Sequence, residues 1–282
     1  MKIGIICALS ESHFPSSFYY SLKNIFESVK IVNMKQDLVG LDYLFIGADH
    51  YAPHIGIWRN IDFINTANNL GLKVCVFSTE KIFNDFFPWN WEIQKDLERF
   101  NNLYQRVLDV DDAILLNKKI ARCLISVNYK YLIKEYQKKD EICFIGSTYL
   151  PQYQKRKELL DSLQKKLKID FYEPSPNRSW IEYLNLLGSY RFVLNLPSTN
   201  FNGFCGRFYE TLIVKSIPLQ HVYKNTLSLH PYESNRNDIV FYENEEELID
   251  KIEKIDIIQS DYPVWMEDEI INFFREDLGL II

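Results

Sequence analysis

The residues from Arg191 to Pro218, RFVLNLPSTNFNGFCGRFYETLIVKSIP, constrain the fold more than any other stretch of the chain. RFVLNLP is filled with apolar and β-branched residues and closed by a proline, which predicts a short buried strand. STNFNGFCG reads as a polar loop, RFYETLIVK has apolar residues at helical spacing, and Ile217–Pro218 begins another strand. Strand, loop, helix and strand in this order make half of a nucleotide-binding α/β domain, which binds ligands at the carboxyl edge of its sheet.

Two charged residues, Arg207 and Glu210, stand where this loop becomes the helix, and the segment around them resembles a known family. LPSTNFNGFCGRFYE resembles the donor-site segment of GT-B-type glycosyltransferases, in which a P-S pair, an E-G-F-G string and a second glutamate contact a nucleotide sugar. Gly203–Phe204 match the glycine and the aromatic residue, Glu210 matches the second glutamate, and Asn202 stands in place of the first. Retention and inversion at the transferred sugar therefore both stay open.

The string RFYETL followed by IP also resembles the R-F-x-E…G-x-I-P segment of exostosin-like and spore-maturation-type glycosyltransferases. Lys215 stands where those proteins usually carry glycine. The resemblance covers about residues 140 to 245 and is only architectural before them. It implies a metal-independent transferase without a cofactor, which moves a sugar from a nucleoside-diphosphate sugar to an acceptor. That acceptor stays open among a glycan, a small molecule, a protein and a viral DNA base.

Composition limits the partners of the chain. Its 282 residues are 47% hydrophobic and 15% aromatic, enough for two domains with large cores. The net charge of −6 argues against a surface that mainly grips a polyanion, so nucleic acid is a possible but not a favoured partner. No apolar run approaches the roughly 20 residues of a transmembrane helix, and the short apolar start reads as a buried strand rather than a signal peptide.

The five cysteines are scattered, mostly in apolar strand-like runs, and none has the spacing of a metal site. They are Cys7, Cys75, Cys123, Cys143 and Cys205. We expect buried, reduced thiols in a cytoplasmic protein.

Strands alternate with helices along the whole chain, which predicts parallel sheets wound in βαβ units. A helix that ends at Gly71 precedes a buried strand at Lys73–Phe77, and the segment from about Trp91 reads as a helix. After a lysine-rich stretch the pattern restarts at Ile142–Gly146. We therefore predict an α/β, GT-B fold of two facing Rossmann-like domains. The expected parts are an acceptor-side domain at 1–139, a nucleotide-sugar domain at 140–261, and a C-terminal helix at 262–282 that crosses back.

A nucleotide-sugar donor carries a diphosphate that becomes the leaving group, so the site needs hydrogen-bond donors and positive charge. The loop after Ile142–Gly146 and the helix that follows it offer both. The resemblance assigns Arg156 and Arg207 to the diphosphate and Glu210 to the ribose hydroxyls, and guanidinium suits phosphate. The remaining predicted donor-site residues are Gly146, Ser147, Thr148, Ser198 and Asn202.

The acceptor side carries fewer signals. His13 lies in the loop after the first strand, where it could act as a general base, and Arg207 is the second predicted catalytic residue. Asp49, His50 and His54 are further candidates in another loop at the sheet edge.

Two alternatives stay open from the residues alone. The string VLDVDD contains Asp109 and Asp111 in the D-x-D spacing with which metal-dependent GT-A glycosyltransferases bind a divalent cation, although it follows an expected helix. The chain could also be a non-catalytic binding protein with a degenerate nucleotide fold. The replaced glutamate at Asn202 and the replaced glycine at Lys215 are the observations that favour this second alternative.

Overall fold

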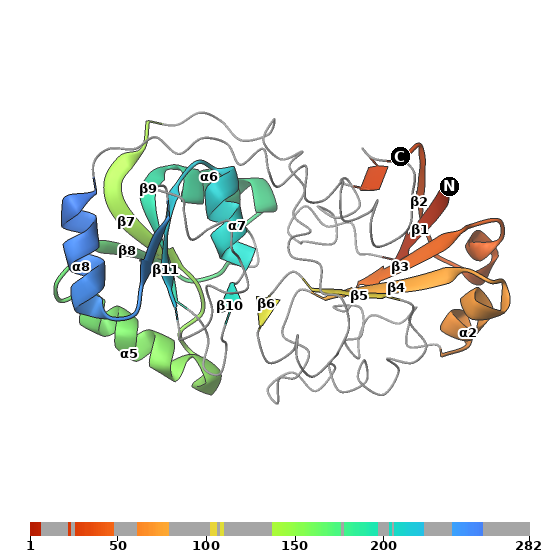
Figure 1. Ribbon diagram of the computed structural model, residues 1–282, viewed down its shortest axis with the longest axis horizontal. Helices are drawn as coiled ribbons and strands as arrows, with labels where there is room; N and C mark the ends of the chain where they lie inside the picture. The colour runs from red at the N-terminus through yellow and green to blue at the C-terminus, as the bar shows by residue number, and fades with distance from the viewer. Residues whose placement is uncertain are drawn as a thin grey trace. The chain divides into compact units, whose positions relative to one another are not determined.

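The protein is described from a computed structural model (Figure 1). The structure describes residues 1–6, 22–23, 26–47, 61–78, 102–105, 108–109, 137–175, 178–196, 203–204, 206–222 and 239–255. The described residues form two compact units, one before residue 129 and one from residue 137 onward. The boundary between them lies outside the described residues, so its predicted position at 139 stays a prediction.

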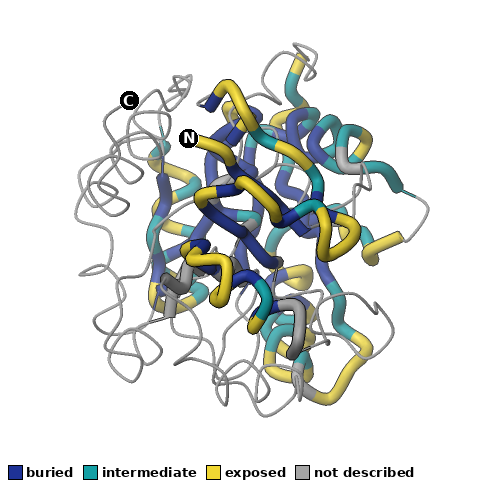
Figure 2. The backbone as a smooth tube through the Cα atoms, turned by 90° about the vertical axis from the view of Figure 1, so that its right-hand side faces the viewer, coloured by how far each residue is buried: buried dark blue, intermediate teal, exposed yellow. Residues whose placement is uncertain are grey.

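The N-terminal unit is built on a parallel sheet in the order β2-β1-β3-β4-β5. Its described elements are β1 (Lys2–Ile6), β2 (Ser28–Ile31), a 3-10 helix (Lys35–Leu38), β3 (Tyr43–Gly47), α2 (Ile61–Asn69), β4 (Lys73–Ser78), β5 (Asn102–Gln105) and β6 (Leu108–Asp109). Figure 2, which faces this unit, shows the described strands as buried along much of their length.

Two expectations for this unit have clear outcomes. Gly71 follows the end of α2 with φ +76, the left-handed conformation that a helix-stop glycine adopts, so that prediction is confirmed. The helix expected from about Trp91 is wrong at its far end, because Asn102–Gln105 form β5, parallel to β4. The β-favouring pair Leu103–Tyr104 joins the sheet edge there, and tertiary pairing overrides the helical pattern.

The C-terminal unit repeats the architecture with a parallel sheet in the order β12-β11-β9-β7-β8. Its described elements are β7 (Lys139–Ile145), a 3-10 helix (Pro151–Tyr153), α5 (Gln154–Leu163), β8 (Ile169–Tyr172), α6 (Trp180–Gly188), β9 (Tyr190–Asn195), β10 (Gly203–Phe204), α7 (Gly206–Ile213), β11 (Ile217–His221), β12 (Val240–Tyr242) and α8 (Glu245–Lys254). The strand–loop–helix–strand reading of Arg191–Pro218 is thereby confirmed.

Helices cover both faces of this sheet (Figure 1). Leu160 and Leu163 of α5 and Leu248 of α8 pack with one row of strand side chains. Leu184 and Leu187 of α6 pack with the opposite row, together with Val214, which follows α7. The predicted α/β fold of two Rossmann-like parallel sheets is confirmed.

Local signals explain where these helices begin. α6 starts with a capping box, in which the Ser179 hydroxyl accepts from the Glu182 N–H and the Glu182 carboxylate accepts from the Ser179 N–H. α8 is capped by Asn244 and has three glutamates in its first turn, which suits the positive end of the helix dipole. Gly188 is the last residue of α6.

The strand order places the site. In both sheets the order is 2-1-3-4-5, counted along the chain within each unit. The chain direction across the sheet reverses between the first and third strands, and doubly wound folds bind ligands outside the carboxyl ends at this switch point. In the C-terminal unit the switch point lies between β7 and β9. The segment after β7 begins at Gly146, and α7 with Arg207 follows β9.

Candidate donor site at the carboxyl edge

Gly146 directly follows β7, and its missing side chain makes room for Arg207. A Cβ atom on Gly146 would lie 2.8 Å from Cζ of Phe144 and 2.9 Å from Nη2 of Arg207, closer than such atoms approach in proteins. The guanidinium of Arg207 also lies over the Phe144 ring, 5.2 Å from its centroid. The sequence predicts both Gly146 and Arg207 as donor-site residues, and the structure brings them into contact.

Arg207 is the second residue of α7 and carries unused hydrogen-bonding capacity. Its Nε and Nη1 atoms are buried and have no hydrogen-bond partner among the described residues. A buried polar group without a partner costs free energy, and a charged one costs more. The position adds to the cost, because the N-terminal end of a helix is electrostatically positive. An anion bound here would satisfy the free nitrogens and reverse both effects.

Arg156 approaches the same segment from another helix. It is the third residue of α5, and its Nη1 donates to the Ser147 carbonyl oxygen at 3.1 Å. The guanidinium lies 4.4 Å from the centroid of the Tyr153 ring, which orients it. Two arginines from two helices therefore lie at Gly146–Ser147. Neither the 3-10 helix that precedes α5 nor α5 itself has a side-chain cap.

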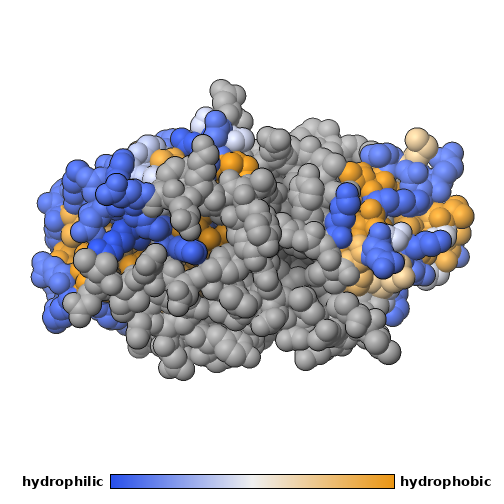
Figure 3. Space-filling view, turned by 90° about the horizontal axis from the view of Figure 1, so that it is seen from above, coloured by the Kyte–Doolittle hydropathy of each residue, from blue (hydrophilic) through white to orange (hydrophobic). Residues whose placement is uncertain are grey.

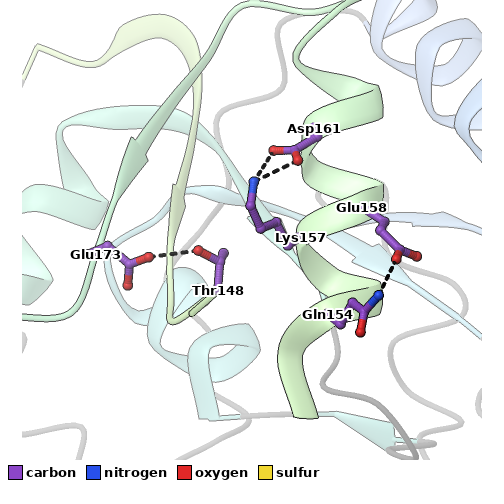
Figure 4. Close-up of polar contacts among 6 residues, drawn as sticks. All are labelled: Thr148, Gln154, Lys157, Glu158, Asp161 and Glu173. Carbon is purple, nitrogen blue, oxygen red and sulfur yellow. Dashed lines mark hydrogen bonds and ion pairs between the residues drawn. The ribbon is translucent and has the colours of Figure 1, made fainter. Parts of the chain in front are cut away.

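Two further polar groups of this segment form hydrogen bonds within the protein. The Gly146 N–H donates to the Tyr172 carbonyl at 3.1 Å and so extends the sheet. The Thr148 hydroxyl donates to Oε1 of Glu173 at 2.8 Å (Figure 4). Gln154–Glu158 and Lys157–Asp161 pair along α5 in the same view. Thr148 is thus held by a neighbouring carboxylate, a contact that the sequence does not predict.

Glu210 lies in the contact between α6 and α7. Only 3% of its surface is exposed, and its Oε2 accepts a hydrogen bond of 2.5 Å from the Tyr183 hydroxyl. Tyr183 is the fourth residue of α6, and no motif in the sequence singles it out. Its ring packs with the apolar cluster between the helices and the sheet, which is the ordinary signal of a core aromatic residue.

Lys215 explains one departure from the family pattern. It follows α7 with φ +56, and its N–H and the Ser216 N–H donate to the Leu212 and Thr211 carbonyls. This is a Schellman ending, whose left-handed residue is usually glycine. The glycine of the related segments therefore matches a backbone requirement at the helix end, at the sheet edge opposite Arg207. The lysine at this position therefore does not argue against the predicted donor site at the carboxyl edge.

Cys143 in β7 is a buried thiol outside any disulfide, as expected, and so is Cys75 in β4. Burial raises the pKa of Cys143 to about 12, which makes it a poor nucleophile. His221 ends β11 at the carboxyl edge, and burial lowers its pKa below the ordinary histidine value. It is a titratable residue that the sequence reading does not single out.

The remaining predicted residues lie outside the described part of the chain. They are His13, Asp49, His50, His54, Asp111, Ser198 and Asn202. Asp109 ends the short strand β6, so the expectation that the D-x-D string follows a helix is wrong. Within the described ranges, no group of three His, Cys, Asp or Glu side chains could hold a metal ion. Among the same residues, no helix is long and apolar enough to span a membrane.

Comparison with solved structures identifies the fold. A structure of T4 phage BGT in complex with UDP and Mn2+ matches with a TM-score of 0.53 and 14% identity, over 99% of this chain and 97% of that one. An alpha1,3-fucosyltransferase matches with a TM-score of 0.47 and 11% identity, over 100% and 91% of the two chains. A mutant of S. aureus TarM, in complex with fondaparinux, alpha-GlcNAc-glycerol and UDP, matches at 0.47 and 16%, over 91% and 55%.

The first match carries the conclusion, since the other two fall below a TM-score of 0.5. The chain has the GT-B fold, as its resemblance to GT-B-type glycosyltransferases implies. No protein-family model matches the sequence, and no curated protein matches it.

Proposed function

We propose that this protein is a metal-independent glycosyltransferase whose C-terminal unit binds a nucleoside-diphosphate sugar at the carboxyl edge of its sheet. The observation that carries the proposal is Arg207 at the switch point of a doubly wound sheet: its Nε and Nη1 atoms are buried and have no partner among the described residues. A diphosphate is the ligand that suits this position. Guanidinium binds phosphate oxygens in a bidentate manner, and helix N-termini attract the same charge.

The same geometry suits the chemistry of sugar transfer. As the acceptor attacks, the bond between the anomeric carbon and the diphosphate oxygen breaks, and its electron pair stays on the diphosphate. The negative charge of the leaving group grows in the transition state, so a fixed cation stabilises it more than the bound donor. Arg207 supplies this charge beside Gly146, and Arg156 holds the Ser147 carbonyl at the neighbouring residue. With two arginines in these positions, the leaving group needs no metal ion.

The rest of the donor and the acceptor complete the proposal. Glu210 binds the ribose hydroxyls, and Ser147, Thr148, Ser198 and Asn202 line the donor site. The N-terminal unit holds the acceptor, with His13 as general base, and the helix at 262–282 packs back on that unit. A nucleoside diphosphate, UDP first, is the ligand to test, because the matched T4 phage BGT structure contains UDP. A cytoplasmic glycan, small molecule or protein is favoured over DNA as acceptor, given the net charge of −6.

Nucleotide binding is the direct test. We expect one of UDP, GDP, ADP and TDP to raise the melting temperature of the protein and to bind with a measurable Kd in isothermal titration calorimetry. The matching sugar nucleotide should then be hydrolysed slowly without acceptor, at a rate that EDTA leaves unchanged. If no nucleotide binds at millimolar concentration, the proposal is wrong. If EDTA abolishes hydrolysis and Mn²⁺ restores it, a metal site involving Asp109 and Asp111 replaces the metal-independent one.

A further inference from the structure

A tyrosine outside every predicted motif contacts the carboxylate assigned to the ribose. The hydroxyl of Tyr183 on α6 donates to Oε2 of Glu210 on α7 at 2.5 Å, within the usual range for a hydroxyl that donates to a charged oxygen. The two helices pack against each other beside the sheet; Tyr183 is the fourth of the nine residues of α6, and Glu210 is the fifth of the eight residues of α7. The hydrogen bond therefore connects two neighbouring helices, and it is not a capping contact within one helix.

The orientation of a glutamate carboxylate is poorly determined by its own chain. The last torsion of the side chain is broad and roughly two-fold, unlike the staggered torsions before it. A ribose presents two neighbouring hydroxyls, and a carboxylate accepts from both only when its plane is turned toward them. A hydrogen bond from a fixed donor to one oxygen removes that freedom and leaves the direction of the other oxygen defined.

We propose that Tyr183 is a positioning residue for Glu210: its hydroxyl fixes the plane of the carboxylate so that this group can accept the ribose hydroxyls of the donor. The inference rests on the proposed function, which places the ribose at Glu210. A tyrosine suits the task because it is neutral. It donates to Oε2 and leaves the negative charge of the Glu210 carboxylate, which attracts the ribose hydroxyls. A lysine or arginine in its place would neutralise that charge. The packed ring holds the hydroxyl in place.

The chain offers a matched control at the other end of the sheet. Tyr190 begins β9, and its hydroxyl donates to Oδ2 of Asp170, also at 2.5 Å. Its ring belongs to the same apolar cluster as that of Tyr183. Tyr183→Phe and Tyr190→Phe therefore each remove a hydroxyl that donates to a carboxylate, and the Tyr190 hydroxyl also contacts the Tyr172 hydroxyl and Nζ of Lys139. Only Tyr183 lies beside the proposed ribose site.

The experiment measures how well the protein distinguishes ribose from deoxyribose. Affinities for UDP, 2′-deoxy-UDP and 3′-deoxy-UDP, or for the same series of whichever nucleotide binds best, are measured by calorimetry. They are measured for the wild-type protein, Tyr183→Phe, Tyr190→Phe and Glu210→Gln. We expect Tyr183→Phe to weaken binding of the ribonucleotide about 5- to 20-fold and to leave the deoxynucleotides within about twofold. Tyr190→Phe should keep the full preference for ribose, and Glu210→Gln should lose it.

Kinetics give a second measurement. Ribose does not change during the reaction, so Tyr183→Phe should raise the KM for the donor and leave kcat within about twofold. Tyr183→Met, which also lacks the hydroxyl, replaces the phenylalanine variant if that protein does not fold. An unchanged preference for ribose in a folded Tyr183 variant overturns this inference alone. A wild-type protein that binds no nucleotide overturns the proposed function and the inference with it.

Discussion

A basic side chain lies at each end of α7: Arg207, which belongs to its first turn, and Lys138, which contacts its C-terminal end from before β7. Their hydrogen-bonding situations are opposite. Arg207 lies at the carboxyl edge of the C-terminal sheet, with Nε and Nη1 buried and without a partner in the described part of the chain. Lys138 lies at the amino edge, where its Nζ donates to the Gly188 carbonyl at 3.1 Å, the Val214 carbonyl at 2.9 Å and the Ser216 hydroxyl at 2.8 Å. Lys138 thus has three hydrogen-bond acceptors, whereas two nitrogens of Arg207 have no acceptor among the described residues.

The difference separates a residue that stabilises the fold from one that we propose binds the diphosphate of the donor. The carbonyls that Lys138 binds belong to Gly188, the last residue of α6, and to Val214, which follows the last residue of α7. Helix ends leave such carbonyls without intrahelical partners and favour a cation. Arg207 faces the reverse situation, a cation at the positive end of a helix. Such an arrangement is retained when it performs a task that the stability of the fold does not require.

The charged side chains at the surface of the C-terminal unit resemble neither Lys138 nor Arg207. Seen from above, much of its described surface is hydrophilic (Figure 3). Exposed pairs such as Lys157–Asp161 and Lys254–Asp250 are i,i+4 helix contacts. Such pairs contribute roughly 0.3–0.5 kcal/mol each at most. The comparison between the sheet edges therefore depends on Arg207 and Lys138 and not on the surface charges.

The largest expected effect is on catalysis at the carboxyl edge. Arg207→Met should lower kcat for donor hydrolysis by about 30- to 1000-fold, or roughly 2–4 kcal/mol, because a charge-assisted contact to the leaving diphosphate is lost. The free energy of unfolding without ligand should stay the same or rise, since two buried nitrogens without a partner among the described residues are removed. Steady-state kinetics and urea unfolding measure the two effects.

Arg191→Met is the control for this substitution. Arg191, the second residue of β9, also lies over a phenylalanine ring, 5.2 Å from the centroid of Phe192. Its Nη2 is buried and has no partner among the described residues, as are Nε and Nη1 of Arg207, but its Nη1 pairs with Asp140 of β7 and it lies at the amino edge of the sheet. It should keep wild-type kinetics. If the two variants have the same kcat, the unpartnered nitrogens of Arg207 do not mark the leaving-group site.

A smaller effect, on stability alone, is expected at the amino edge. Lys138→Met should lower the free energy of unfolding by about 2–3 kcal/mol, because two carbonyls and a hydroxyl lose a charged donor. The ratio kcat/KM should stay within about twofold. Lys139→Met, at the neighbouring exposed lysine, should cost less than about 1 kcal/mol. A loss of activity without a loss of stability in Lys138→Met would contradict the distinction between the two edges.

The smallest effect is expected beside Lys138, at the left-handed residue that ends α7. Lys215→Gly should raise the free energy of unfolding by about 0.5–1 kcal/mol, because glycine removes the strain of φ +56 but adds freedom to the unfolded chain. Donor kinetics should not change. Thermal and urea unfolding of Lys215→Gly and Lys215→Ala measure the effect, and equal stability of these two variants would show that the backbone is unstrained.

The sequence by itself determined the alternation of strands and helices, the restart of the pattern after residue 139, and the elements around Arg207 and Glu210. These follow from local periodicity and from turn and cap residues, which act over a few positions. The same local reasoning failed at Asn102–Gln105, where pairing with β4 decides for a strand. It also could not show why Lys215 replaces a glycine, because the φ of a single residue depends on how its helix ends.

Only the tertiary structure decided which side chains meet. β7 lies between β8 and β9, and this order brings Gly146 to Arg207. The packing of α6 beside α7 brings Tyr183 to Glu210, and the amino edge brings Lys138 to two helix ends. These contacts join residues far apart along the chain, so they depend on strand order and helix packing. Nothing in the local sequence pattern encodes which buried nitrogen finds an acceptor within the protein and which does not.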